Sequence, residues 1–138
     1  MTNLQKTIRI TKLSIILMIL GANLNAQKFE KDDLAHIEAG ALIPSATYFG
    51  VSALDWEDKW KYILPAITVN TAGVIKEISD SQKPNNRFDM KDIMFNNVGM
   101  LISMGLIEGL KAVGVPENIA VGSVITISTV SLGLTVNF

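Results

Sequence analysis

Residues 89–112 of the chain read DMKDIMFNNVGMLISMGLIEGLKA, and this stretch decides the fold class. Its apolar residues follow the spacing of an α-helix, and Asp89 and Asp92 stand three apart at its start, as in a capping box. A glycine and a proline follow its end, where such residues terminate helices. The stretch therefore predicts a helix over about residues 90–113.

Two further apolar stretches precede this helix, over about residues 32–54 and 57–80, and each contains one proline. Each also has aspartates suited to cap its first turn, namely Asp32 or Asp33 and Asp55. Residues 80–88, DSQKPNNRF, carry the strongest loop signal in the chain. Because the connections are short, we expect the three helices to run antiparallel in sequence order.

The last stretch, residues 119–138, contains no charge and allows two interpretations. From residue 130 onward, apolar residues alternate with small or polar ones, which is the periodicity of a strand. A run of 20 uncharged residues is also long enough to cross a bilayer. One strand cannot close a barrel, so we expect a short helix and then an extended tail packed on the bundle. The predicted fold is all-α, a compact antiparallel bundle of three main helices.

The first 26 residues follow the order of a signal peptide. Residues 1–12 carry three basic side chains and no acidic one, residues 13–22 form an apolar run, and small Ala26 precedes the expected cleavage site. The run is shorter than the ~20 residues of a membrane span. An uncleaved anchor or an amphipathic first helix is the alternative. We expect one helical envelope domain over residues 27–138, exported and either periplasmic or membrane-associated.

The composition excludes several classes of protein. Apolar residues make up 49% of the 138 residues and charged ones 18%, which excludes intrinsic disorder and disfavours a freely soluble cytosolic enzyme. The net charge of −1 provides no electrostatic footprint for nucleic acid, so we expect no nucleic-acid partner. Without cysteine the chain has no disulfide, thiol nucleophile, thiolate metal site or lipidated cysteine.

Polar and small residues form one stripe on each predicted helix when residues are placed at 100° intervals. The stripes contain Asp32, His36, Gly40, Ile43 and Thr47; Asn70, Gly73, Glu77 and Asp80; and Asp92, Asn96, Gly99 and Ser103. Small residues let helix backbones approach closely, and buried polar groups need partners. We therefore expect the stripes to face one another, with His36, Glu77 and Asp92 or Asn96 meeting near one end of the bundle.

Taken singly, these residues also have ordinary structural interpretations as helix caps, a satisfied core histidine, and a surface ion pair between Lys76 and Asp80. The coincidence of three stripes favours an interior polar cluster, because charges within apolar helices are costly. Arg87, in the loop between the second and third helices, should approach the same end. The candidate residues are Asp32, His36, Asn70, Lys76, Glu77, Asp80, Arg87, Asp89, Asp92 and Asn96.

Three motifs, in order, resemble those of the VanZ-like family and of the related YfiM-type exported proteins. Residues 32–36, DDLAH, resemble their opening Asp-Lys-x-x-His, with Asp33 in place of the usual lysine. Residues 73–80, GVIKEISD, are similar to the Gly-x-x-Lys-Glu-x-x-Asp of the YfiM type, and residues 89–99 resemble the shared Asp-x-x-Asp-x-x-x-Asn-x-x-Gly. The resemblance spans roughly residues 31–105 and implies a small multi-helix envelope protein. VanZ-like members are associated with glycopeptide-type antibiotic resistance, and YfiM-type proteins are lipoproteins, which this chain without cysteine is not.

Standard catalytic signatures are absent from the sequence: it has no Gly-x-Ser-x-Gly, phosphate-binding glycine loop or His-Glu-x-x-His. One histidine cannot make a typical zinc site, although His36 with Glu77, Asp80 and Asp92 offers ligands that Mg²⁺ or Mn²⁺ accepts. His36, four residues after Asp32, is also a candidate general base whose tautomer the Asp32 carboxylate would set. We expect no cofactor and no resident metal.

Three functions are compatible with these features. The first is a non-enzymatic, membrane-associated helical protein whose polar cluster is structural or binds a small polar or lipid head group. The second is an enzyme acting on a phosphorylated or lipid-linked envelope substrate through His36, Glu77 and Asp92, with Arg87 as an anion contact. The third is a scaffold that uses the uncharged tail. The expected partner is membrane lipid or another envelope protein.

Overall fold

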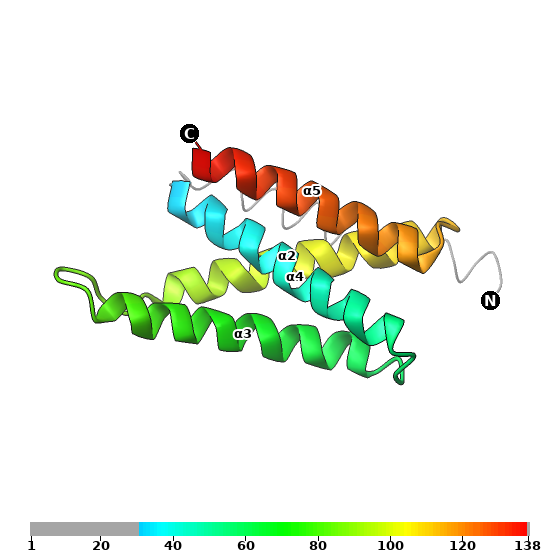
Figure 1. The fold of residues 1–138 in the computed structure, drawn as a ribbon, viewed down its shortest axis with the longest axis horizontal. Helices are drawn as coiled ribbons and strands as arrows, with labels where there is room; N and C mark the ends of the chain where they lie inside the picture. The colour runs from blue at the N-terminus through cyan, green and yellow to red at the C-terminus, as the bar shows by residue number, and fades with distance from the viewer. Residues whose placement is uncertain (1–30, 138) are drawn as a thin grey trace.

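The computed structural model describes residues 31–137, and the regular structure of this part of the chain is entirely helical. The four helices are α2 (Lys31–Ala53), α3 (Trp60–Ser81), α4 (Met90–Ala112) and α5 (Glu117–Asn137). Consecutive helices run in opposite directions (Figure 1). The predicted all-α antiparallel bundle is confirmed, and the predicted signal peptide, residues 1–26, lies outside the described residues.

Helix α2 lies at the centre of the bundle and contacts the other three helices, whereas the described backbones of α3 and α5 stay apart and the ion pair of Lys61 with Glu117 joins these two helices at one end. It crosses α4 at two glycines. A Cβ atom added at Gly40 would lie 2.1 Å from the backbone oxygen of Asn96, and one at Gly99 would lie 1.9 Å from that of Ile37. No side-chain carbon fits at such distances. The close approach expected of these small-residue stripes is confirmed.

Helix α3 begins later than the sequence predicted. Turns occupy residues 54, 55, 58 and 59, and Asp55 adopts a left-handed conformation with φ of 52°. The N-cap is Lys59, which makes no side-chain capping bond. Asp55 is therefore not the cap, because the chain uses it in the turn that leaves α2 instead of at the entry to α3.

The extended conformation expected for the C-terminal tail is wrong, because helix α5 continues to Asn137. The buried residues Ala120, Val121, Val124 and Ser128 recur at helical spacing, and Val121 and Val124 form one core cluster with Tyr48 and Ile107. The hydroxyls of Thr126 and Thr129 donate to the carbonyl oxygens four residues earlier, at 2.8 Å in both cases. Helix α5 therefore packs on α2 and α4 before the segment of period-two spacing begins, and in that segment Ser131 donates a hydrogen bond to Glu38 of α2.

Charged residues gather at the two ends of the bundle. Residues 62–75 of α3, 93–107 of α4 and 118–137 of α5 contain none. Large apolar side chains in these segments face outward, among them Ile67, Leu101 and Ile127, each more than half exposed. Of the described helices, α4 is the one long and apolar enough to cross a membrane.

The interior, in contrast, is rich in polar groups. The buried polar or charged residues of the described chain are Asp33, His36, Ser45, Glu77, Asp92, Asn96, Ser103 and Ser128. Ionisable side chains are seldom fully buried in water-soluble domains, yet Asp33, His36, Glu77 and Asp92 are buried here beside the apolar core. The bundle therefore has an apolar outer surface between its charged ends and a partly polar interior.

Candidate functional site

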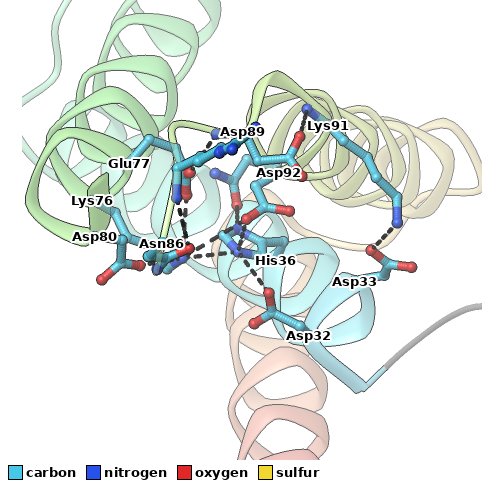
Figure 2. A network of polar contacts seen from close by, with 12 residues as sticks. Asp32, Asp33, His36, Lys76, Glu77, Asp80, Asn86, Asp89, Lys91 and Asp92 are labelled. Atoms are coloured by element: carbon cyan, nitrogen blue, oxygen red, sulfur yellow. Dashed lines mark hydrogen bonds and ion pairs between the residues drawn. The ribbon is translucent and has the colours of Figure 1, made fainter. Parts of the chain in front are cut away.

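The start of α2, the end of α3 and the start of α4 meet at one end of the bundle, and Figure 2 shows polar side chains from all three converging there. We call this group the His36 cluster. It consists of Asp32, His36, Lys76, Glu77, Asp80, Asp92 and Asn96. The convergence predicted from the three stripes is confirmed, and Glu77 joins His36 through the ammonium of Lys76.

The imidazole of His36, which is 3% exposed, has partners at both ring nitrogens. Its Nδ1 lies 3.3 Å from Oδ1 of Asn96, an acceptor, so Nδ1 carries a proton. Its Nε2 lies 3.1 Å from Nζ of Lys76 and 3.1 Å from Oδ2 of Asp92. A neutral ring accepts from Lys76 at Nε2, and only an imidazolium donates to Asp92 there. The ring therefore serves one of these two partners at a time.

The ammonium of Lys76 lies among the carboxylates of the cluster. Its Nζ is 3.2 Å from Oε1 of Glu77, 2.9 Å from Oδ2 of Asp80 and 4.0 Å from Oδ2 of Asp92. Burial alone lowers the pKa of Lys76, but its hydrogen bonds to Asp80 and Glu77 outweigh burial and the pKa rises. The side chain is 45% exposed, so this central cation can reach solvent.

The pKa values of two aspartates in the cluster, Asp92 and Asp80, are shifted in opposite directions. Burial raises the pKa of Asp92, and the carboxylates of Glu77 and Asp32 raise it further, against the opposing effect of His36. Hydrogen bonds from Lys83 and Lys76 lower the pKa of Asp80 to about 2. Asp92 is therefore the more readily protonated of the two, and it is the one that faces the histidine.

Glu77, 2% exposed, completes the N-terminus of α4. The side chain of Asp89 accepts from the backbone N–H of Lys91 at 2.8 Å, which confirms Asp89 as the cap. In a capping box, the side chain of Asp92 would accept the backbone N–H of Asp89. Glu77 accepts it instead, with Oε2 at 3.0 Å, and Asp92 is left to contact His36.

Two pockets of different character adjoin the cluster. The polar pocket, about 740 Å³, is lined by Asp32, Asp33, Lys76, Glu77, Asp80, Lys83, Asn85, Asn86, Arg87, Phe88, Asp89, Lys91 and Asp92. The apolar groove, about 300 Å³, is lined by Asp32, Ala35, His36, Ala39, Ile43, Val69, Ala72, Gly73, Lys76, Asn96 and Leu132. Asp32 and Lys76 line both, so the two spaces meet at the His36 cluster.

Three predicted residues lie outside the His36 cluster. One is Asp89, which caps α4 and donates its backbone N–H to Glu77. The amide of Asn70 pairs with that of Asn97 through reciprocal hydrogen bonds of 3.1 and 2.9 Å between α3 and α4. Arg87 lines the polar pocket, as expected of that loop, and its guanidinium forms no ion pair with the His36 cluster. Sequence reasoning missed the pairing of buried Asp33 with Lys91, 2.8 Å apart, because Asp33 had the ordinary interpretation of a helix cap.

Asp32, His36 and Asp92 each place one ligand atom within 4.8 Å of the others, which is close enough to hold a metal ion. Imidazole and carboxylate ligands suit a hard divalent cation. Such an ion would compete with the ammonium of Lys76, which already contacts His36 and Asp92. The cluster therefore already contains a positive charge at the place where a metal would bind.

A second polar cluster, which the sequence did not reveal, lies at the opposite end. We call it the Tyr48 cluster, and it consists of Tyr48, Lys61, Tyr62, Glu108, Lys111 and Glu117. Nζ of Lys111 lies 2.8 Å from the Tyr48 hydroxyl, 2.7 Å from Glu108 and 3.3 Å from Glu117. Burial raises the pKa of Glu117, but hydrogen bonds led by that from Lys61 outweigh it and lower the pKa to about 2.

Comparison of the chain with protein-family models, with curated proteins and with solved structures finds no match. The resemblance to VanZ-like and YfiM-type proteins therefore stays a prediction. Residues from all three of its motifs, represented by His36, Lys76 and Asp92, do meet in one cluster.

Proposed function

We propose that the protein is an exported, membrane-associated helical protein of the bacterial envelope that binds a lipid head group at the His36 cluster. One observation carries the proposal. A polar pocket of about 740 Å³ opens at one end of a bundle whose outer surface is apolar between its charged ends. Sites that take small molecules combine a concave space with a few convergent polar groups, and this pocket has both.

The charges around the pocket favour a zwitterionic head group. Six acidic and four basic residues line it, and both signs occur close to the opening. Arg87 supplies a guanidinium suited to a phosphate, because its donors match phosphate oxygens. Asp32, whose side chain is 70% exposed, supplies a carboxylate suited to an ammonium. A head group that carries phosphate and ammonium together pairs with both.

The distribution of apolar side chains supports association with a membrane. Exposed isoleucine, leucine, methionine and valine side chains lie on the uncharged segments, such as Ile67, Leu101 and Ile127. Their contact with water is unfavourable by ~25 cal/mol for each Å² of apolar surface. Contact with lipid hydrocarbon removes this cost, and it leaves the charged ends in the aqueous boundary.

Binding is tested with glycerophosphoethanolamine, the water-soluble head group, and the purified full chain in detergent micelles. We expect saturable binding by titration calorimetry. Asp32→Asn and Arg87→Gln should each weaken it about tenfold, the effect of one charge-assisted hydrogen bond. Lys59→Gln is the matched control, because Lys59 pairs with Glu57 outside the pocket and is also exposed. Absence of binding to the native chain, or equal weakening by the control, contradicts the proposal.

Export and membrane association are tested separately by fractionation of cells that carry the tagged full chain. We expect the protein in membranes after a carbonate wash, with a mature N-terminus at Gln27 by mass spectrometry. Recovery in the cytosol with Met1 retained would contradict this half of the proposal.

A further inference from the structure

We propose that the apolar groove holds an acyl chain of the same molecule whose head group occupies the polar pocket. The ligand class is then a monoacyl or diacyl phospholipid with a zwitterionic head, bound by both of its parts. This inference rests on the proposed function, because the head group is what places the chain at the groove.

The groove lies between α2 and α3, at the place where α5 leaves α3 uncovered. Ala35 and Ala39 of α2 line one wall, Ala72 of α3 lines the other, and Leu132 of α5 borders the opening. The described backbones of α3 and α5 stay apart, and the Lys61–Glu117 ion pair joins these helices at the opposite end of the bundle, so the space between them over α2 is not filled by packing. A volume of about 300 Å³ suits a narrow chain and is too small for a helix, whose diameter is ~10 Å.

Small side chains create this groove. Alanines occupy the wall positions 35, 39 and 72, and Gly73 completes the floor, where an added Cβ would lie 2.8 Å from Nδ2 of Asn96. Apart from its polar end, the lining offers only hydrocarbon. Water in such a space lacks the two to four polar partners that it needs, whereas an alkyl chain needs none.

The groove and the polar pocket form one continuous site. Asp32 and Lys76 line both spaces, with His36 and Asn96 at the end of the groove. Lys76 places its ammonium among the carboxylates and also lines the apolar groove, and long basic side chains commonly occupy such boundaries. A phospholipid has the same order of parts, with charges at one end and hydrocarbon adjoining them.

The experiment compares two probes that differ only in the chain, a monoacyl glycerophosphoethanolamine and glycerophosphoethanolamine itself. The full chain is incubated with each probe at constant detergent concentration, and native mass spectrometry measures the fraction bound. We expect the acylated probe to bind about tenfold more tightly or better, since its buried methylene groups add to the affinity.

Two variants locate the chain. Ala72→Leu fills the groove and should reduce the advantage of the acylated probe to less than about threefold, while the soluble head group binds as before. Thr71→Leu is the control, because it adds the same kind of side chain at an exposed position on the same helix, outside the groove. Ala39→Leu fills the groove from the α2 side. If Ala72→Leu loses its helical circular dichroism, the same binding comparison is made with Ala39→Leu.

The outcomes separate the two proposals. Equal binding of both probes overturns the acyl-chain site and leaves the head-group site in place. Binding of neither probe overturns the proposed function, and this inference fails with it. An equal loss in Ala72→Leu and Thr71→Leu overturns the assignment of the chain to the groove. Loss of the advantage in the groove-filling variants alone supports it.

Discussion

The two ends of the bundle are built from similar parts and differ in how completely those parts are paired. Each has a lysine among carboxylates, Lys76 at one end and Lys111 at the other. In the Tyr48 cluster the phenol of Tyr48 is fully buried and contacts Glu108, Glu117 and Lys111. Each residue of this cluster hydrogen-bonds to at least one other residue of the cluster. Helices α2, α3, α4 and α5 each contribute to it.

The His36 cluster takes residues from α2, α3 and α4 and opens on the polar pocket. Its histidine has two competing partners at Nε2, and its lysine is more exposed, 45% against 26% for Lys111. A closed network holds helices together, whereas an open one has charges that can still take a ligand. The comparison therefore assigns stability to the Tyr48 cluster and binding to the His36 cluster.

The largest expected effect comes from separating α2 and α4 where they cross. Gly99→Ala places a Cβ 1.9 Å from the Ile37 oxygen, and the helices must move apart near the His36–Asn96 bond. We expect a loss of about 3 kcal/mol in unfolding free energy, together with loss of head-group binding. Gly122→Ala is the control, because an added Cβ there meets nothing within 4 Å. It should raise stability slightly, through helix propensity. Thermal unfolding by circular dichroism measures both, and equal effects would contradict the close crossing.

The second prediction separates the roles of the two lysines. Lys111→Met leaves Glu108, Glu117 and the Tyr48 hydroxyl without their shared cation and should cost about 2–3 kcal/mol. Lys76→Met removes a more exposed ion pair and should cost about 1 kcal/mol. It should also tighten binding of glycerophosphoethanolamine, since the freed carboxylates attract its ammonium. Denaturant titration and calorimetry give both quantities. The comparison fails if Lys111→Met alters binding as strongly as Lys76→Met.

The sequence predicted the parts of this architecture that depend on local signals. Helical spacing placed α2 and α4 within one or two residues of their ends, and the Asp89 cap is as expected. The His36 cluster was also predictable, because its residues stand four apart within helices and lie on stripes with glycines that pack closely.

Features that depend on contacts between distant residues were not predictable. The helical form of the chain from residue 130 onward is one of them, since the alternation there suits a strand, and in the structure Ser131 donates a hydrogen bond to Glu38 of α2. In the Tyr48 cluster, Tyr48, Lys61 and Tyr62 bond to charged side chains 46 to 69 residues away, at the ends of helices whose sequence shows no shared stripe. The exchange of capping partners, with Glu77 in place of Asp92, likewise requires the three-dimensional arrangement.

The smallest expected effect is the change in unfolding free energy at low pH. The Tyr48 cluster should lose stability as the pH falls, whereas protonation of Asp92 in the His36 cluster should oppose that loss. The pKa of Glu117 is lowered to about 2 from 4.5, so its ion pairs stabilise the fold above pH 4.5 and are lost as the pH falls towards 2. The pKa of Asp92 is raised from 3.8, so its buried charge opposes folding above its folded pKa, and protonation removes that cost as the pH falls. Lys61 and Lys111 face Glu117, whereas His36, Lys76, Asp32 and Glu77 surround Asp92.

Glu117→Gln should therefore lower the free energy of unfolding at pH 7 by ~1 kcal/mol and flatten the decline of that free energy between pH 4.5 and 2. Asp92→Asn should cost less at pH 7 than Glu117→Gln, because it removes a buried charge while keeping an acceptor. Unfolding midpoints measured from pH 7 to pH 2 check both variants. If Asp92→Asn flattened the acid decline as Glu117→Gln does, the contrast between the ends would be wrong.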